Sequence, residues 1–194
     1  MAVSAAHDRT FEGQRVPPVG RWNIDASHSS LQFVARHMMI SKVRGRFRKF
    51  EGTIVIAEDP LQSSVEAIID ASSIDTGDPD RDAHLRAEEF LDVERFPHVR
   101  FKSTSLRAGD DGKWQLDGDL TIRDVTRVVE ITIEFCGVAD DPWGNVRAGF
   151  LGTTEINREE FDITWNQALE AGGFLVGKGV KVEVDVEAVL ESDD

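Results

Sequence analysis

The 194-residue chain is poor in several residue types, with one cysteine, no tyrosine and six prolines. A single cysteine, Cys136, excludes an internal disulfide and suits a reducing compartment. No stretch approaches the roughly 20 consecutive apolar residues that a transmembrane helix needs. Residues 1–20 lack a positively charged segment followed by an apolar run, so no secretory signal is visible. The sequence therefore predicts a cytoplasmic protein.

Positive charge is also scarce. Lys and Arg total 22 against 36 Asp and Glu, which gives a net charge of −14. That sign opposes binding to a nucleic-acid backbone, so we expect no nucleic-acid partner. The five histidines show no metal-ligand spacing. We expect neither a metal nor a cofactor.

The length and the 40% hydrophobic content suit one well-buried core. Residues 1–19 have no hydrophobic period and end in Pro17-Pro18. They predict an N-terminal tail that is flexible or laid over the surface. Residues 20–191 form the predicted single domain.

Apolar residues recur at every second position from Trp22 to Gly52, which is the period of a half-buried strand. The apolar parity changes between Phe47 and Phe50. Both sets can face inward only if an extra residue interrupts the strand, so a β-bulge is predicted near Arg48-Lys49.

Further alternating segments follow along the chain. One short helix is predicted over 79–90, behind the capping pair Asp78-Pro79, and a long loop with at most one helical turn over 157–178. The other strands are expected around 65–69, 99–103, 114–122, 129–135, 146–156 and 180–190. Eight strands with short turns and one helix predict an all-β, eight-stranded antiparallel up-and-down β-barrel.

Several motifs, in this order and spacing, carry a family resemblance. They include Trp22-x-Ile24-Asp25-x-x-His28-Ser29, Val43-x-Gly45-x-Phe47, Phe90-Leu91-Asp92-Val93-x-x-Phe96-Pro97, Gly118-x-Leu120-Thr121-Ile122 and Ile156-Asn157-Arg158. Over about residues 20–190 the chain resembles the YceI-like family, the lipocalin-like polyisoprenoid-binding proteins. Arg123-Asp124 departs from the family pattern, which often has Gly after the Leu-Thr-Ile run.

The resemblance implies a lipocalin-like barrel that holds a long isoprenoid or other alkyl chain. An eight-stranded barrel either fills with side chains or holds one small ligand. The residues alone leave open the alternative that side chains fill the interior as a solid core. The resemblance favours a bound ligand. The large apolar residues expected at or near the lumen are Phe33, Phe47, Phe50, Ile69, Phe90, Phe101, Trp165 and Phe174.

Polar candidates are fewer. Arg36, His37, Arg81 and His84 are candidates for a polar cavity mouth. The basic cluster Arg36, Lys42, Arg44, Arg46, Arg48 and Lys49 is either a solvated strand face or a landing site for a phosphate head group or an anionic membrane. His28 and Ser29 are neighbours in an extended segment and point to opposite faces, so with Asp25 they predict a polar turn, not a catalytic triad.

No residue is nominated as catalytic, and the predicted function is non-catalytic storage or transport of a polyisoprenoid or similar amphiphilic lipid. Two alternatives stay open: an enzyme acting on a lipid-like substrate in the same cavity, and a ligandless structural barrel. A transient membrane contact and a homodimer also stay open.

Overall fold

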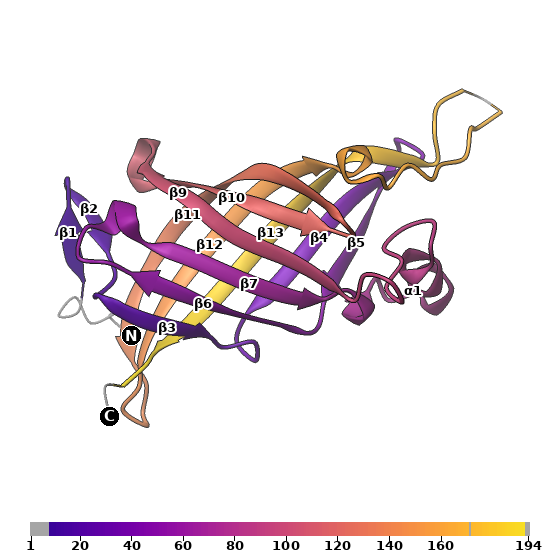
Figure 1. Cartoon of the computed structure of the whole chain (residues 1–194). Helices are drawn as coiled ribbons and strands as arrows, with labels where there is room; N and C mark the ends of the chain where they lie inside the picture. Colours follow the sequence, from indigo (N-terminus) through magenta and orange to yellow (C-terminus); the bar gives the residue numbers. More distant parts are fainter. Residues whose placement is uncertain (1–7, 171, 193–194) are drawn as a thin grey trace.

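The computed structural model describes residues 8–170 and 172–192, which close into an antiparallel barrel (Figure 1). Eight strand paths form its wall, and the predicted fold class is confirmed. The first two paths are each split, into β3 (Gly20–Ile24) with β4 (Ser30–His37), and β5 (Ser41–Phe47) with β6 (Phe50–Ile56). The others are β7 (Ser64–Asp70), β9 (His98–Ala108), β10 (Trp114–Ile122), β11 (Val125–Asp140), β12 (Val146–Asn157) and β13 (Val176–Leu190).

Closure depends on β13, which pairs with β12 along one edge and with both halves of the first path along the other. Its N-terminal part pairs with β4 and its C-terminal part with β3. Every strand in this ring is antiparallel to its neighbours. The ring therefore has no free edge in its central part.

The change of parity predicts a β-bulge near Arg48 and Lys49; the structure instead has a break in the second path at these two residues. Their backbone N–H groups donate to Ser73, to its carbonyl and its hydroxyl respectively. After the break, β6 pairs with β7. Before it, β5 pairs instead with the short strand β8 (Ile74–Asp75). The barrel is therefore split on this side at one end, and the segment from 71 to 97 covers the gap.

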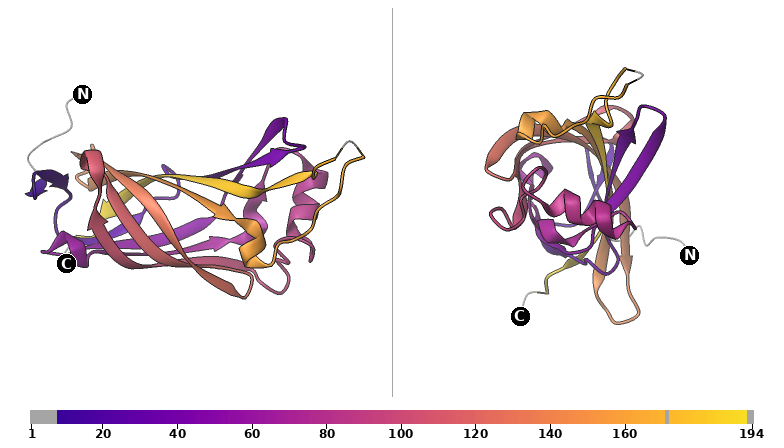
Figure 2. Two further views of the ribbon diagram at one scale, coloured as in Figure 1. Left: turned by 90° about the horizontal axis from the view of Figure 1, so that it is seen from above. Right: turned by 90° about the vertical axis from the view of Figure 1, so that its right-hand side faces the viewer.

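The one α-helix, α1 (Pro79–Arg86), lies across that end of the barrel (Figure 2). Asp78 caps it, because its carboxylate accepts the N–H groups of Asp80 and Arg81. It ends four residues before the predicted 90, since turns begin at Ala87. The chain also forms 3₁₀ turns η1 (Pro60–Gln62), η2 (Ala71–Ser73), η3 (Asp110–Gly112) and η4 (Arg158–Phe161), the last being the turn predicted within 157–178.

The described part of the predicted tail is a hairpin of β1 (Arg9–Phe11) and β2 (Gln14–Val16), fixed on the other end of the barrel. Its turn is Glu12-Gly13, and both residues have positive φ, the signature of a tight hairpin turn. Val16 is 3% exposed, and Arg9 donates to three backbone carbonyls at 17, 57 and 58. This segment is therefore laid over the end of the barrel, the second of the two predicted alternatives; residues 1–7 lie outside the described chain.

Two hydrophobic clusters fill the two ends of the barrel. The cluster at the α1 end contains Ile69, Phe90, Phe161 and Ile163 among its buried members. The cluster at the hairpin end is built around Trp22, which has no exposed surface. No helix in the described chain is long and apolar enough to cross a bilayer.

One arginine ties the closing strands together at the hairpin end. Arg147 on β12 donates to the carboxylates of Asp25, Asp141 and Glu187, at 2.8, 2.8 and 2.5 Å. These groups come from the end of β3, the β11–β12 turn and β13. Hydrogen bonds from Ser27 and Arg147 hold the pKa of Asp25 well below its usual value; those from Asn145 and Arg147 do the same to the pKa of Asp141.

Replacing Arg147 by Met is expected to destabilise the protein at neutral pH, and less at acid pH. A lowered folded-state pKa gives a stabilising contribution that is complete above the ordinary value of 3.8 and is lost as the pH falls below it. Urea unfolding from neutral pH down to about pH 3 would measure the free energy of unfolding of both proteins, and the difference between them should become smaller in acid.

The matched control is Arg107→Met. Arg107 pairs with Asp117 and Glu130, but its side chain is 48% exposed, so its loss should cost about 0–1 kcal/mol. If the difference in the free energy of unfolding between Arg147→Met and wild type stays constant with pH, the proposed role of the Arg147 ion pairs is contradicted.

Candidate ligand-binding cavity

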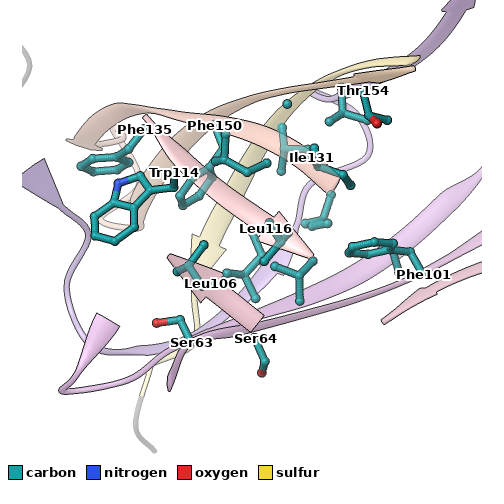
Figure 3. A pocket seen from close by; sticks show the side chains of 18 of the residues that line it. Ser63, Ser64, Phe101, Leu106, Trp114, Leu116, Ile131, Phe135, Phe150 and Thr154 are labelled. Carbon is teal, nitrogen blue, oxygen red and sulfur yellow. The ribbon is translucent and has the colours of Figure 1, made fainter. Parts of the chain in front are cut away.

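A cavity of about 240 Å³ lies inside the barrel, and every strand path contributes to its wall (Figure 3). It runs from Val16 and Trp114 at the hairpin end to a ring of side chains near Phe50, Ile69 and Phe101. Inward-facing Val, Ile, Leu and Phe side chains make up most of the wall. The interior is thus hollow between the two end clusters.

The hollow has an identifiable cause in the sequence. Two inward-facing glycines, Gly118 and Gly152, leave their own side-chain space to the residues beside them. A Cβ at Gly118 would overlap the ring of Phe101, and one at Gly152 would lie 2.5 Å from Val184. The Phe101 ring and the Val184 methyl group therefore lie over these glycines, against the wall, and the barrel axis stays open.

The wall has almost no polar chemistry. None of the described residues that line it has an ionisable side chain. Its hydroxyl groups belong to Ser30, Ser63, Ser64 and Thr154. Ser63 Oγ accepts the Ala57 N–H at 3.1 Å, and Thr154 Oγ1 donates to the Glu130 carbonyl at 2.7 Å. The cavity therefore suits a neutral, apolar molecule.

The cavity reaches the surface beside Ser64, an exposed residue at the start of β7. The β7–β9 ladder ends here at the pair Glu66–Lys102. The next N–H, that of Val65, donates to the Ser103 hydroxyl at 2.8 Å. Because the strands separate at this point, the serines at 63 and 64 form the polar edge of an otherwise apolar space.

The α1 end is closed by a plug of side chains from α1 and the loop after β12. Arg158, only 4% exposed, donates to the carbonyls of Ile163, Trp165 and Gly177. Burial lowers the pKa of Arg158. This guanidinium fixes the loop that places Phe161 in the α1-end cluster.

Three of the eight predicted lumen residues, Phe50, Ile69 and Phe101, line the cavity. The other five lie outside its wall, on the α1 side or at the surface. Phe33 and Phe47 pack together with ring centroids 5.8 Å apart, and a Cβ at Gly45 would overlap the Phe33 ring.

The remaining three belong to the α1 end. Phe90 and Trp165 pack at 5.3 Å, and both rings meet His84 edge-on. Phe174 is 54% exposed in the loop before β13. Phe33 and Phe47 belong to strands and the other three to loops, and all five lie beyond the cavity along the barrel axis.

The predicted polar mouth also lies away from the cavity. Arg36 is exposed on the outer face of β4, and His37 ends that strand. Arg81 Nε donates to the Thr76 hydroxyl at 2.7 Å, and His84 Nε2 lies 2.7 Å from the Glu89 carboxylate. The two helix residues thus form local polar contacts around α1, and none of the four lines the wall.

The sequence reasoning missed much of the wall. Trp114, Leu116, Ile131, Phe135 and Phe150 all line the cavity. The alternation along β10 and β11 marks them as inward-facing. Ranking candidates by size and by family motif, instead of by strand parity alone, left them out.

Asp25, His28 and Glu187 bring their ligand atoms within 4.8 Å of one another, outside the cavity wall. His28 Nδ1 lies 2.8 Å from Asp25, and the Ser29 hydroxyl instead contacts the Glu187 backbone. Arg147 already pairs with both carboxylates. The group is a polar turn, as the sequence predicts.

The family model for the YceI-like domain matches residues 22–188. The chain belongs to the YceI-like family. A UPF0312 protein of Vibrio parahaemolyticus is 38% identical over 138 residues, 71% of this chain and 73% of that protein. A UPF0312 protein of Staphylococcus epidermidis is 37% identical over 174 residues, 89% and 99% of the two chains.

Solved structures share the YceI-like barrel. BcnA of Burkholderia cenocepacia has a TM-score of 0.72 and 21% identity, covering 84% of this chain and 98% of its own. A polyisoprenoid-binding domain from Saccharophagus degradans has a TM-score of 0.68 and 15% identity, covering 88% and 98%. At these identities the likeness shows the fold alone.

Two phenylalanine truncations should separate the wall from the surface. Phe101→Ala removes a buried ring and should cost about 3–5 kcal/mol in the free energy of unfolding. Phe174→Ala removes a mostly exposed ring and should change it by less than about 0.5 kcal/mol. Urea unfolding measures both, and similar effects would contradict the placement of the two rings.

Proposed function

We propose that this protein is a non-catalytic carrier that binds the hydrocarbon chain of an amphiphilic lipid inside its barrel. The observation that supports this most is the hollow, apolar cavity whose described wall has no ionisable side chain. A wall of this kind recognises a ligand by excluding water from it. A polyisoprenoid chain is the ligand favoured by the family and by the name of the Saccharophagus domain.

The energy of an empty cavity supports a resident ligand. Cavities in protein cores cost about 24 cal/mol per Å³, so an empty space of about 240 Å³ would cost on the order of 6 kcal/mol. A hydrocarbon that fills the space recovers most of this.

The size of the cavity limits what fits. An apolar cavity of about 150 Å³ accepts benzene, so this one has room for roughly ten carbons. Burial of roughly ten CH₂ groups gives ~8 kcal/mol, against about 4–15 kcal/mol for association and ordering. A longer chain must therefore extend toward the edge at Ser63 and Ser64, and we place the polar head group on that side.

The enzyme alternative has less support. A catalytic site on the same ligand needs an acid, a base or a nucleophile directed into the lumen. The described wall offers only hydroxyl groups, two of which make hydrogen bonds to the backbone. The carrier reading needs none of these groups.

The test blocks the cavity from inside. Val184 lines the cavity opposite Gly152, so the larger ring of Val184→Phe adds side-chain volume within the cavity. We expect organic extracts of purified wild type to contain a stoichiometric long-chain lipid by mass spectrometry, and extracts of the variant to contain at least tenfold less. Delipidated wild type should bind farnesol or dodecanol, followed by Trp114 fluorescence, and the variant should not.

Val128→Phe is the matched control, because it adds the same ring at a site that is 71% exposed. It should retain the lipid. Unfolding curves establish that both variants are folded. The proposal fails if wild type neither carries nor binds a chain, or if folded Val184→Phe binds as wild type does.

A further inference from the structure

The end of the barrel near α1 has an exposed group of apolar side chains. In the turn between β4 and β5, Met39 is 64% exposed and Ile40 is 80% exposed. Phe174, in the loop before β13, is 54% exposed. The two segments are joined, since the Met38 N–H donates to the Leu175 carbonyl at 2.8 Å. We call Met39, Ile40 and Phe174 the apolar tip.

The backbone of this turn makes the choice of residues unusual. Met38 and Met39 have φ angles of 52° and 61°, and the Ile40 N–H donates to the His37 carbonyl. Asn, Asp and Gly are favoured at two such positions, because a side chain with a full Cβ substituent is strained there. Small polar residues would relieve the strain and improve solubility. Folding therefore does not account for the methionines.

Cations surround the tip. Arg36, Lys42 and Arg44 are exposed on the outer faces of β4 and β5, with Arg36 directly opposite Lys42. Within the described chain, these three side chains form no hydrogen bond or ion pair, unlike Arg46 and Arg48, which share the Asp75 carboxylate. The tip thus combines exposed apolar groups with uncompensated positive charge, in a chain of net charge −14.

We propose that the apolar tip docks on the surface of an anionic phospholipid bilayer. Met39, Ile40 and Phe174 would enter the boundary between head groups and acyl chains, and the cations beside them would meet the lipid phosphates. Screening limits the repulsion from the acidic remainder of the molecule to about 8 Å at physiological salt. The tip also lies at the end of the barrel away from both termini (Figure 1).

A second exposed apolar side chain shows the contrast. Trp143, in the β11–β12 turn, is 81% exposed, but it lies next to Asp140 and Asp141. Anionic lipid would repel that turn. Charge complementarity therefore selects the Met39 end as the docking surface. This inference goes beyond the proposed function, because a ligand can occupy the cavity without any membrane contact.

The test is flotation of the purified protein with vesicles. Wild type should float with vesicles of phosphatidylcholine and phosphatidylglycerol, should stay unbound with phosphatidylcholine alone, and should be released by added salt. Met39→Ser/Ile40→Ser, and separately Lys42→Glu/Arg44→Glu, should each lower the partition coefficient by roughly tenfold or more. These positions are exposed, so both variants are expected to fold, which circular dichroism would verify.

Trp143→Ser is the matched control and should bind as wild type does. Equal binding by wild type and both tip variants, or no binding of wild type to anionic vesicles at low salt, overturns the proposal. A tip that instead joins two copies of the chain would appear as a dimer in sedimentation that Met39→Ser/Ile40→Ser abolishes, with no vesicle binding; that result also overturns it. Lipid content after extraction is measured separately and does not depend on this outcome.

Discussion

The fold depends on β13, which pairs with β12 along one edge and with two different strands, β4 and β3, along the other. The same strand continues from β4 to β3 while keeping β12 beside it. Once the ring closes in this way, alternate residues of every strand must face the axis. Whether the interior is solid or hollow is then decided by side-chain volume at these positions. At Gly118 and Gly152, the Phe101 ring and a Val184 methyl group occupy the space that a side chain would take, and the barrel axis stays open.

The two ends of this ring are closed by different means. At one end, the N-terminal hairpin covers the barrel, and the ring centroids of Phe11 and Trp114 lie 6.3 Å apart. This hairpin lies outside the residues that the family model matches. At the other end, Arg158 fixes a loop against α1 by donating to backbone carbonyls. One closure is a separate segment laid on the rim, and the other is a core cluster. The polar edge at Ser63 and Ser64 lies on the hairpin side of the cavity.

Much of this fold could be predicted, because alternation and capping are local. The parity change at Arg48-Lys49, the Asp78 cap and the strand order follow from neighbouring residues. The level of a side chain along the barrel axis is not local, because it depends on the stagger of all eight strands. Phe33 and Phe101 are both inward-facing aromatic residues next to a glycine, yet only Phe101 lines the cavity. For the same reason, the predicted mouth residues Arg36, His37, Arg81 and His84 lie outside the cavity wall.

Three unpaired cations of β4 and β5 and the carboxylates held by Arg147 lie at opposite ends of the described barrel. The ion pairs of Arg147 and the acidic β11–β12 turn lie at the hairpin end, and the unpaired cations of β4 and β5 lie at the other end. A chain that needed only solubility would gain nothing from separating its charges this way, since net charge alone provides it. Separated charge orients a molecule in an external field or at a charged surface. The two ends of the described barrel therefore differ in the chemistry of their closures and in these two groups of charges.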